Sequence, residues 1–170
     1  YMEDFENWGA DAPGYPLPLC WQTLTNFSGT QTPYITDNSL TGTSKLLVFD
    51  GNSENSYTVA ILPKTSINVR DLYVKFRMSS AGTGYGPAVG VMTDPYVFDT
   101  FESVATVNPT AAFSWNDYEV YFNSYNGDGK YIAFRYLGKK EMGILNMVYL
   151  DDVEVRPFLH CELPSDIRVR

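Results

Sequence analysis

Acidic side chains near both ends of the chain are the residues best suited to bind a cation. In residues 149–155, period-two alternation places Asp151 on the same strand face as two valines. If those valines face the core, Asp151 is buried, and a buried carboxylate must be paired, hydrogen-bonded, protonated or metal-bound. Glu6 lies in an acidic segment around Phe5. Since the first and last strands of β-sandwiches are often neighbours, Glu6 and Asp151 could share one cation.

Calcium suits such a site because it is a hard cation that takes carboxylate and carbonyl oxygens. The loop that begins at Asp50 could add further oxygens, with Asp50 and Asn52 as its candidates. The spacing of these residues does not match an EF-hand loop. The alternative is that Asp151 accepts hydrogen bonds from loop amides while the N-terminal acids are solvated, and the sequence leaves both interpretations open.

The sequence offers little for catalysis, and we predict that the protein is not an enzyme. A Ser-His-Asp or Cys-His arrangement would have to use His160, the one histidine. Cys161 adjoins it, but neighbours in an extended chain point to opposite sides. No helix follows the glycine-rich residues 82–86, so no phosphate-binding loop is indicated. The 20 acidic residues allow many carboxylate pairs of the glycosidase kind, and no one pair stands out.

Sugar binding needs exposed aromatic faces flanked by polar groups. Tyr85 and Tyr125 lie in glycine-rich turns, and Trp8 lies beside the N-terminal acids. These three are the candidate ligand-binding residues, with Tyr96 and Trp115 as weaker ones. The alternative is that most of these rings seal the ends of the fold.

The elements that position these residues are predicted to be strands. No segment of ten residues shows helical periodicity, whereas residues 72–78 alternate between apolar and amphipathic or charged side chains. Similar strand patterns, separated by turn-rich segments, cover residues 20–25, 45–49, 56–62, 88–92, 101–107, 118–122, 131–136 and 147–155. About ten strands at this spacing indicate an all-β, two-sheet antiparallel sandwich or a barrel. The Asn-Gly and Asp-Gly steps in residues 126–129 predict that the strands on either side form a hairpin.

Charge and cysteine content narrow the classes of partner and compartment. The net charge of -8 comes without a basic stripe, which excludes a nucleic-acid binder, and no apolar run approaches a membrane span. Cys20 and Cys161 could pair in a disulfide outside the cytoplasm, or remain two unrelated thiols. The chain begins at Tyr1, so we expect it to be part of a longer protein.

Three segments together resemble cleaved-adhesin domains, which are jelly-roll modules in surface and secreted proteins of the Bacteroidetes and are similar in layout to MAM domains. The segments are residues 4–8 (Asp-Phe-Glu-Asn-Trp), 131–136 (Tyr-Ile-Ala-Phe-Arg-Tyr) and 149–153 (Tyr-Leu-Asp-Asp-Val). Residues 17–21 also resemble the Pro-x-Cys-Trp segment of such modules. The likeness covers about residues 3 to 156.

The resemblance implies a galactose-binding-like jelly roll over residues 1–156, with one structural calcium held by Glu6 and Asp151. It implies that Cys161 and Pro164, within residues 157–170, lead into a following fibronectin- or immunoglobulin-like domain. It further implies a secreted or cell-surface module that binds a glycan or a host protein. The chain lacks the long Gly- and Asp-rich insertions of better-known members, so their ligands do not carry over. The alternatives are a spacer or accessory domain of a multidomain surface protein, and a fragment of a secreted glycoside hydrolase.

Overall fold

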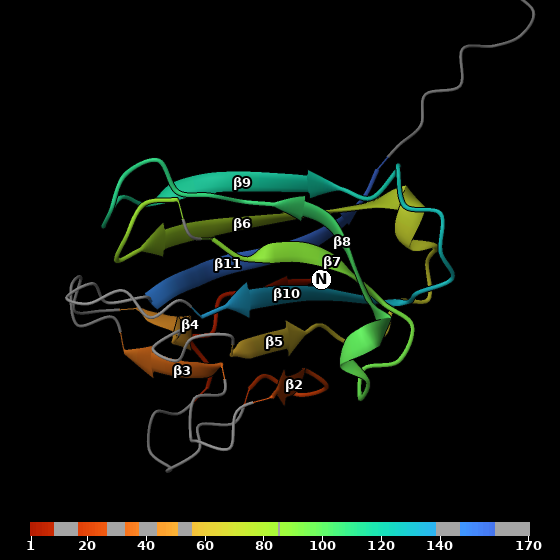
Figure 1. The fold of residues 1–170 in the computed structure, drawn as a ribbon, viewed down its shortest axis with the longest axis horizontal. Helices are drawn as coiled ribbons and strands as arrows, with labels where there is room; N and C mark the ends of the chain where they lie inside the picture. Colours follow the sequence, from red (N-terminus) through yellow and green to blue (C-terminus); the bar gives the residue numbers. More distant parts are fainter. Residues whose placement is uncertain are drawn as a thin grey trace, which may run out of the picture.

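The computed structural model describes residues 1–8, 17–26, 33–37, 44–50, 56–84, 86–138 and 147–158. These residues form two antiparallel sheets that face each other (Figure 1). The predicted all-β, two-sheet sandwich is therefore confirmed. No helix among the described residues is long and apolar enough to cross a membrane.

Each sheet combines strands that are distant in sequence. In order across the six-stranded sheet lie β3 (Tyr34–Asp37), β4 (Lys45–Asp50), β11 (Met147–Pro157), β6 (Leu72–Ser80) and β9 (Asn116–Tyr121), while β1 (Met2–Glu3) also pairs with β11. The five-stranded sheet has the order β2 (Gln22–Thr25), β5 (Tyr57–Ile61), β10 (Tyr131–Leu137), β7 (Ala88–Met92) and β8 (Phe101–Thr106). Two short 3₁₀ turns, η1 (Val69–Asp71) and η2 (Phe98–Thr100), precede β6 and β8.

The alternation predicted for β6 is seen in its burial. Its even-numbered residues from Leu72 to Met78 are buried, whereas Lys75 and Arg77 turn away from the core. Phe76 of β6 meets Phe134 of β10 edge to face, with ring centroids 5.0 Å apart. Because these two rings come from different sheets, their packing joins the two layers of the sandwich.

The predicted hairpin between β9 and β10 is wrong. β9 pairs with β6 in one sheet, and β10 pairs with β5 and β7 in the other. The connecting segment crosses between the sheets and contains Tyr125, which is 4% exposed and accepts a hydrogen bond from the Gly129 N–H at 3.0 Å. Burial of this aromatic ring at the end of the core outweighs the local turn signals.

We expect Phe134→Ala to lower the free energy of unfolding by about 3–5 kcal/mol, because it leaves a cavity between the sheets. Phe113→Ala is the matched control, since Phe113 is 60% exposed and its loss should cost less than about 0.5 kcal/mol. Urea unfolding followed by circular dichroism measures both. Equal losses for the two variants would contradict this assignment of the core.

Candidate functional site

The central strand β11 changes partners where its two adjacent aspartates lie. One edge of β11 pairs with β6, while the other edge pairs with β4 at residues 147–150 and with β1 at residues 153–154. Between Asp151 and Glu154 the register with β6 shifts, and Asp152 has a φ of 49°. Two residues of β11 thus lie opposite one residue of β6. Such a bulge bends the strand and changes the direction of its side chains.

Asp151 is buried beside the bulge, where alternation along β11 is interrupted. Val148 and Leu150 face the core before it, and Val153 faces the core after it, so alternation is interrupted between them. Asp151 is 8% exposed, and its Oδ1 accepts a hydrogen bond from the Asp152 N–H at 2.8 Å. The predicted burial is confirmed, but an unbroken alternation is the wrong reason for it.

Burial raises the pKa of Asp151 to about 6, against an ordinary value of 3.8. The hydrogen bond from the Asp152 N–H and the positive charge of Arg77 act in the opposite direction. The negative charges of Asp152 and Glu6 raise the pKa further. Glu6 therefore lies close enough to Asp151 for its charge to act on the Asp151 carboxyl.

Glu6 is held at the start of β4 by backbone contacts. Its Oε1 accepts a hydrogen bond from the Lys45 backbone N–H at 2.9 Å, and the Lys45 ammonium donates to the Glu6 carbonyl at 3.2 Å. The preceding residue, Phe5, is fully buried with a φ of 59°, and its ring meets Trp21 edge to face at 5.7 Å. This buried ring fixes the turn that brings Glu6 beside β11.

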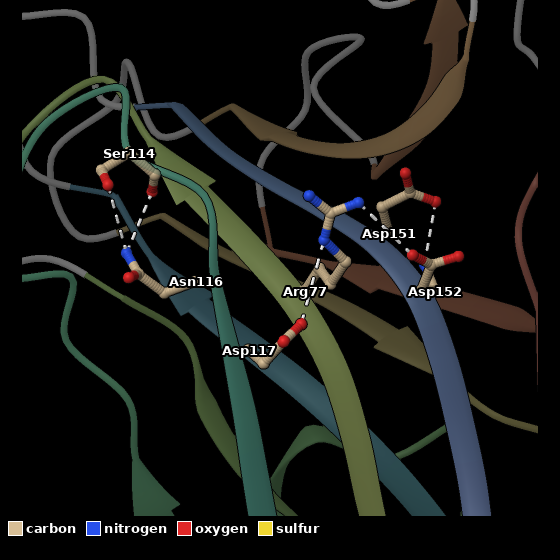
Figure 2. A network of polar contacts seen from close by, with 6 residues as sticks. All are labelled: Arg77, Ser114, Asn116, Asp117, Asp151 and Asp152. Atoms are coloured by element: carbon tan, nitrogen blue, oxygen red, sulfur yellow. Dashed lines mark hydrogen bonds and ion pairs between the residues drawn. The ribbon is translucent and has the colours of Figure 1, made fainter.

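Arg77 is the cation on the outer side of this cluster (Figure 2). Its guanidinium lies 3.6 Å from Asp152 and 3.9 Å from Asp117. It also lies over the Trp115 ring, 5.5 Å from the ring centroid. Because the ion pairs are long and partly exposed, they contribute little stability. Arg77 thus neutralises the outer carboxylates more than it does Asp151. In the described part of the chain, no group of three or more His, Cys, Asp or Glu side chains is placed to hold a metal ion.

Other residues predicted for the cation site are not brought to it. Asp50 lies at the opposite end of β4 from Lys45, roughly 16 Å away along the strand. The expectation that Asp50 joins Glu6 and Asp151 is therefore wrong, because β4 is too long. Asn52 lies outside the described residues.

The predicted ligand-binding aromatic residues do not form one surface either. Tyr125 is buried at the end of the core, so the expectation of an exposed ring there is wrong. Trp8 is half-buried against the core, and its indole N–H donates to Glu3 Oε1 at 3.1 Å. Tyr85 lies outside the described residues. Cys20 is exposed. The predicted disulfide stays a prediction, because Cys161 lies outside the described residues.

The two outer faces of the sandwich differ in chemistry. On the six-stranded sheet, Lys75 of β6 lies opposite Glu154 of β11 on one side and Glu119 of β9 on the other. Arg156 and Glu154 approach to 2.7 Å on the same face. Side chains of opposite charge thus lie next to one another on neighbouring strands of this face. We call this solvent-facing row of charged side chains the ladder of ions.

The outer face of the five-stranded sheet is apolar. It carries a second buried cluster, separate from the main core, formed by Val59, Ile61, Met92, Phe101 and Ala133. Phe98 of η2 packs against this cluster, and its ring lies 6.5 Å from that of Tyr57. A Cβ at Gly90 would lie 2.7 Å from the Phe101 ring, so glycine gives Phe101 room to lie across β7.

Arg135 of β10 lies at the edge of this cluster. Its guanidinium is 4.2 Å from the Phe101 ring centroid and 5.5 Å from that of Tyr57. Two hollows of about 300 Å³ each share Tyr57 and Arg135 as lining residues. The first is completed by Phe98, Asp99 and Phe101, and the second by Gly84, Gly86, Ala88, Thr106 and Leu137.

Sequence reasoning missed this pair of hollows. Period-two alternation assigns Arg135 to an outward position, which is the ordinary place for a solvated charge. The signal that could have indicated more is the buried, apolar nature of its neighbours on the same face, Val59 and Ala133. Recognising it requires knowledge of which strands pair.

No protein-family model matches the sequence, and no curated protein matches it. Solved structures do match the fold. The K1 cleaved adhesin domain of Lys-gingipain from Porphyromonas gingivalis W83 is 14% identical, with a TM-score of 0.68 over 92% of this chain and 97% of that domain. The K2 cleaved adhesin domain of Lys-gingipain is 18% identical, with a TM-score of 0.68 over 90% of this chain and 96% of that domain.

Carbohydrate-binding modules share the fold as well. A family 11 module from Clostridium thermocellum, solved with a β-1,3-1,4-mixed-linked tetrasaccharide, is 16% identical, with a TM-score of 0.55 over 92% of this chain and 94% of that module. The two adhesin domains thus confirm the expected likeness to cleaved-adhesin domains at the level of the fold.

In calcium-free protein, we expect Asp151→Asn to raise the free energy of unfolding at pH 7, by up to about 3 kcal/mol. The folded state binds an extra proton between the ordinary pKa of the carboxyl and its folded value of about 6. The stability given by the neutral carboxyl is therefore complete below about pH 4 and is lost as the pH rises through 6. Asparagine keeps an oxygen that can accept from the Asp152 N–H but carries no charge.

Urea unfolding of both proteins between pH 3.5 and pH 8, with a chelator present, measures the difference. The two stabilities should converge in acid and separate as the pH rises. Curves that stay parallel across this range would contradict the raised pKa.

Proposed function

We propose that this chain is a non-catalytic, extracellular binding module whose ligand contacts the outer face of the five-stranded sheet. The observation that carries the proposal is the pair of adjoining hollows that share Tyr57 and Arg135. A ligand that spans both hollows would contact rings, a cation and polar side chains together.

The chemistry of the hollows suits a saccharide. Sugar rings stack on aromatic faces, and Tyr57 and Phe98 border one hollow from two directions. Asp99, in the same hollow, can accept hydrogen bonds from hydroxyl groups. The size of each hollow, about 300 Å³, lies at the lower end of small-molecule sites.

The likeness to other proteins supports the same class of function. Cleaved adhesin domains and modules solved with a mixed-linked tetrasaccharide or with β-1,4-galactotriose share this fold. Fold alone does not determine function, so the hollows carry the argument. We infer that the partner is a glycan or a host surface protein, and that the module works within a longer secreted or surface polypeptide.

We further propose that a calcium ion bound by Glu6 and Asp151 stabilises the module. Two observations support this proposal: the charge of Glu6 acts on the Asp151 carboxyl, and Asp151 lies beside a bulge in β11. Arg77 lies against Asp152 and does not form an ion pair with Asp151 in the described structure. Asp151 has no ion-pair partner among the described residues, and calcium would supply a positive charge in direct contact with its carboxylate.

Calcium should raise the thermal midpoint of the wild-type protein, and a chelator should lower it. A ligand bound only by the folded state stabilises by about 2.7 kcal/mol at a hundred times its Kd. Both Glu6→Gln and Asp151→Asn should abolish this response. Asp117→Asn is the control, since Asp117 lies on the outer side of Arg77. An identical midpoint with calcium and with chelator would overturn the calcium assignment.

A glycan array and a panel of host matrix proteins test the binding function. We expect Tyr57→Ala to weaken binding of whichever ligand is found by about tenfold, as the loss of one aromatic contact predicts. Tyr121→Ala, on the outer face of the other sheet, should leave binding unchanged. Silence on both panels would favour a spacer domain, and equal effects of the two variants would place the ligand elsewhere.

A further inference from the structure

This inference rests on the proposed function and names the class of ligand. We propose that the ligand is a saccharide that carries a carboxylate group. Arg135 binds this carboxylate in the hollow that Gly84, Gly86 and Thr106 also line.

Arg135 differs from the other arginines of the two sheets. Arg77 lies against two aspartates, and Arg156 lies 2.7 Å from Glu154. Arg135 makes ring contacts with Phe101 and Tyr57, and within the described residues it forms no ion pair. A half-buried guanidinium without an ion-pair partner can bind an anionic ligand group without first breaking a salt bridge.

The composition of the hollows determines where the anion fits. The hollow shared with Gly84, Gly86 and Thr106 has no acid among its described lining residues. A Cβ built on Gly84 meets none of the described residues beyond its chain neighbours within 4 Å. The adjoining hollow contains Asp99, which repels an anion and accepts hydroxyl donors. A carboxylate therefore binds on the glycine side of Arg135, and a neutral sugar hydroxyl binds on the Asp99 side.

The form of the cation favours a carboxylate. A guanidinium presents its N–H groups as a planar fork, which matches the two oxygens of a carboxylate in bidentate pairing. Contact with the Phe101 ring at 4.2 Å restricts the guanidinium and leaves N–H donors for the ligand. The net charge of -8 does not prevent this contact, because acids more than about 8 Å away are screened at physiological salt.

Two pairs of probes test the inference on the intact chain by isothermal titration calorimetry. Tetragalacturonate is compared with its methyl ester, and 3′-sialyllactose is compared with lactose. We expect at least one acid to bind about 10- to 100-fold more tightly than its neutral partner. The pair that shows the preference distinguishes a uronic acid within a chain from a terminal sialic acid.

Variants connect the preference to Arg135. Arg135→Gln should remove it, and Arg135→Lys, which keeps the charge but not the fork, should lose most of it. Arg156→Gln changes the net charge equally on the opposite sheet and should keep the preference. Circular dichroism and thermal unfolding establish whether each variant is folded. If Arg135→Gln does not fold, Arg135→Lys still tests the inference.

The remaining outcomes separate this inference from the proposed function. Equal binding of acid and neutral probes, binding of matrix proteins alone, or an acid preference that persists in Arg135→Gln would overturn the inference and leave a binding module. Absence of binding to every glycan and matrix protein would overturn both.

Discussion

The rest of the structure depends on the burial of one face of each sheet against the other. Aromatic rings from the central strands, Phe76 and Phe134 among them, meet across the interface and fix the spacing of the layers. Because each strand uses one face for this purpose, the side chains on its other face must either be polar or be covered by another part of the chain. The two sheets differ in this respect. One balances charges between neighbouring strands, and the other adds a second apolar cluster beneath η2.

The same requirement explains the position of the two candidate sites. The ladder of ions on the six-stranded sheet leaves its charges paired and its surface solvated. The five-stranded sheet has one arginine among apolar neighbours, and the hollows lie beside it. The carboxylate cluster lies where β11 passes from pairing with β4 to pairing with β1.

Much of the fold was predictable from sequence because alternation is local. The strands around Leu72–Ser80 and Tyr131–Leu137 follow from their period-two patterns. The burial of Asp151 was expected as well, but alternation does not account for it, because the strand is bulged there. The crossing between β9 and β10 did not follow, because strand pairing depends on contacts between distant segments. The bulge at Asp152 did not follow either, since a positive φ at a non-glycine residue has little signature in composition.

The sequence indicated only those candidate residues whose type is unusual at their position along the chain. Glu6 and Asp151 stand out because acids near an apolar strand need an explanation. Arg135 does not, because an arginine at an outward strand position is ordinary. Its importance emerges from the neighbours that β5, β7 and β8 bring to it, and these are set by tertiary structure.

The pairing of β1 with β11 has a mechanical consequence. The Tyr1 amino group donates to the Val155 carbonyl at 3.2 Å, and the Val155 N–H donates to the Tyr1 carbonyl at 2.8 Å. The strands are antiparallel, so both chain directions leave this pair from the same end. A load applied between Tyr1 and Phe158 would open these hydrogen bonds one after another, in the geometry of a zipper. On the Tyr1 side, tension would thus reach the turn that holds Glu6 once this pair had opened, whereas on the Phe158 side it would act on the pairing of β11 with β6.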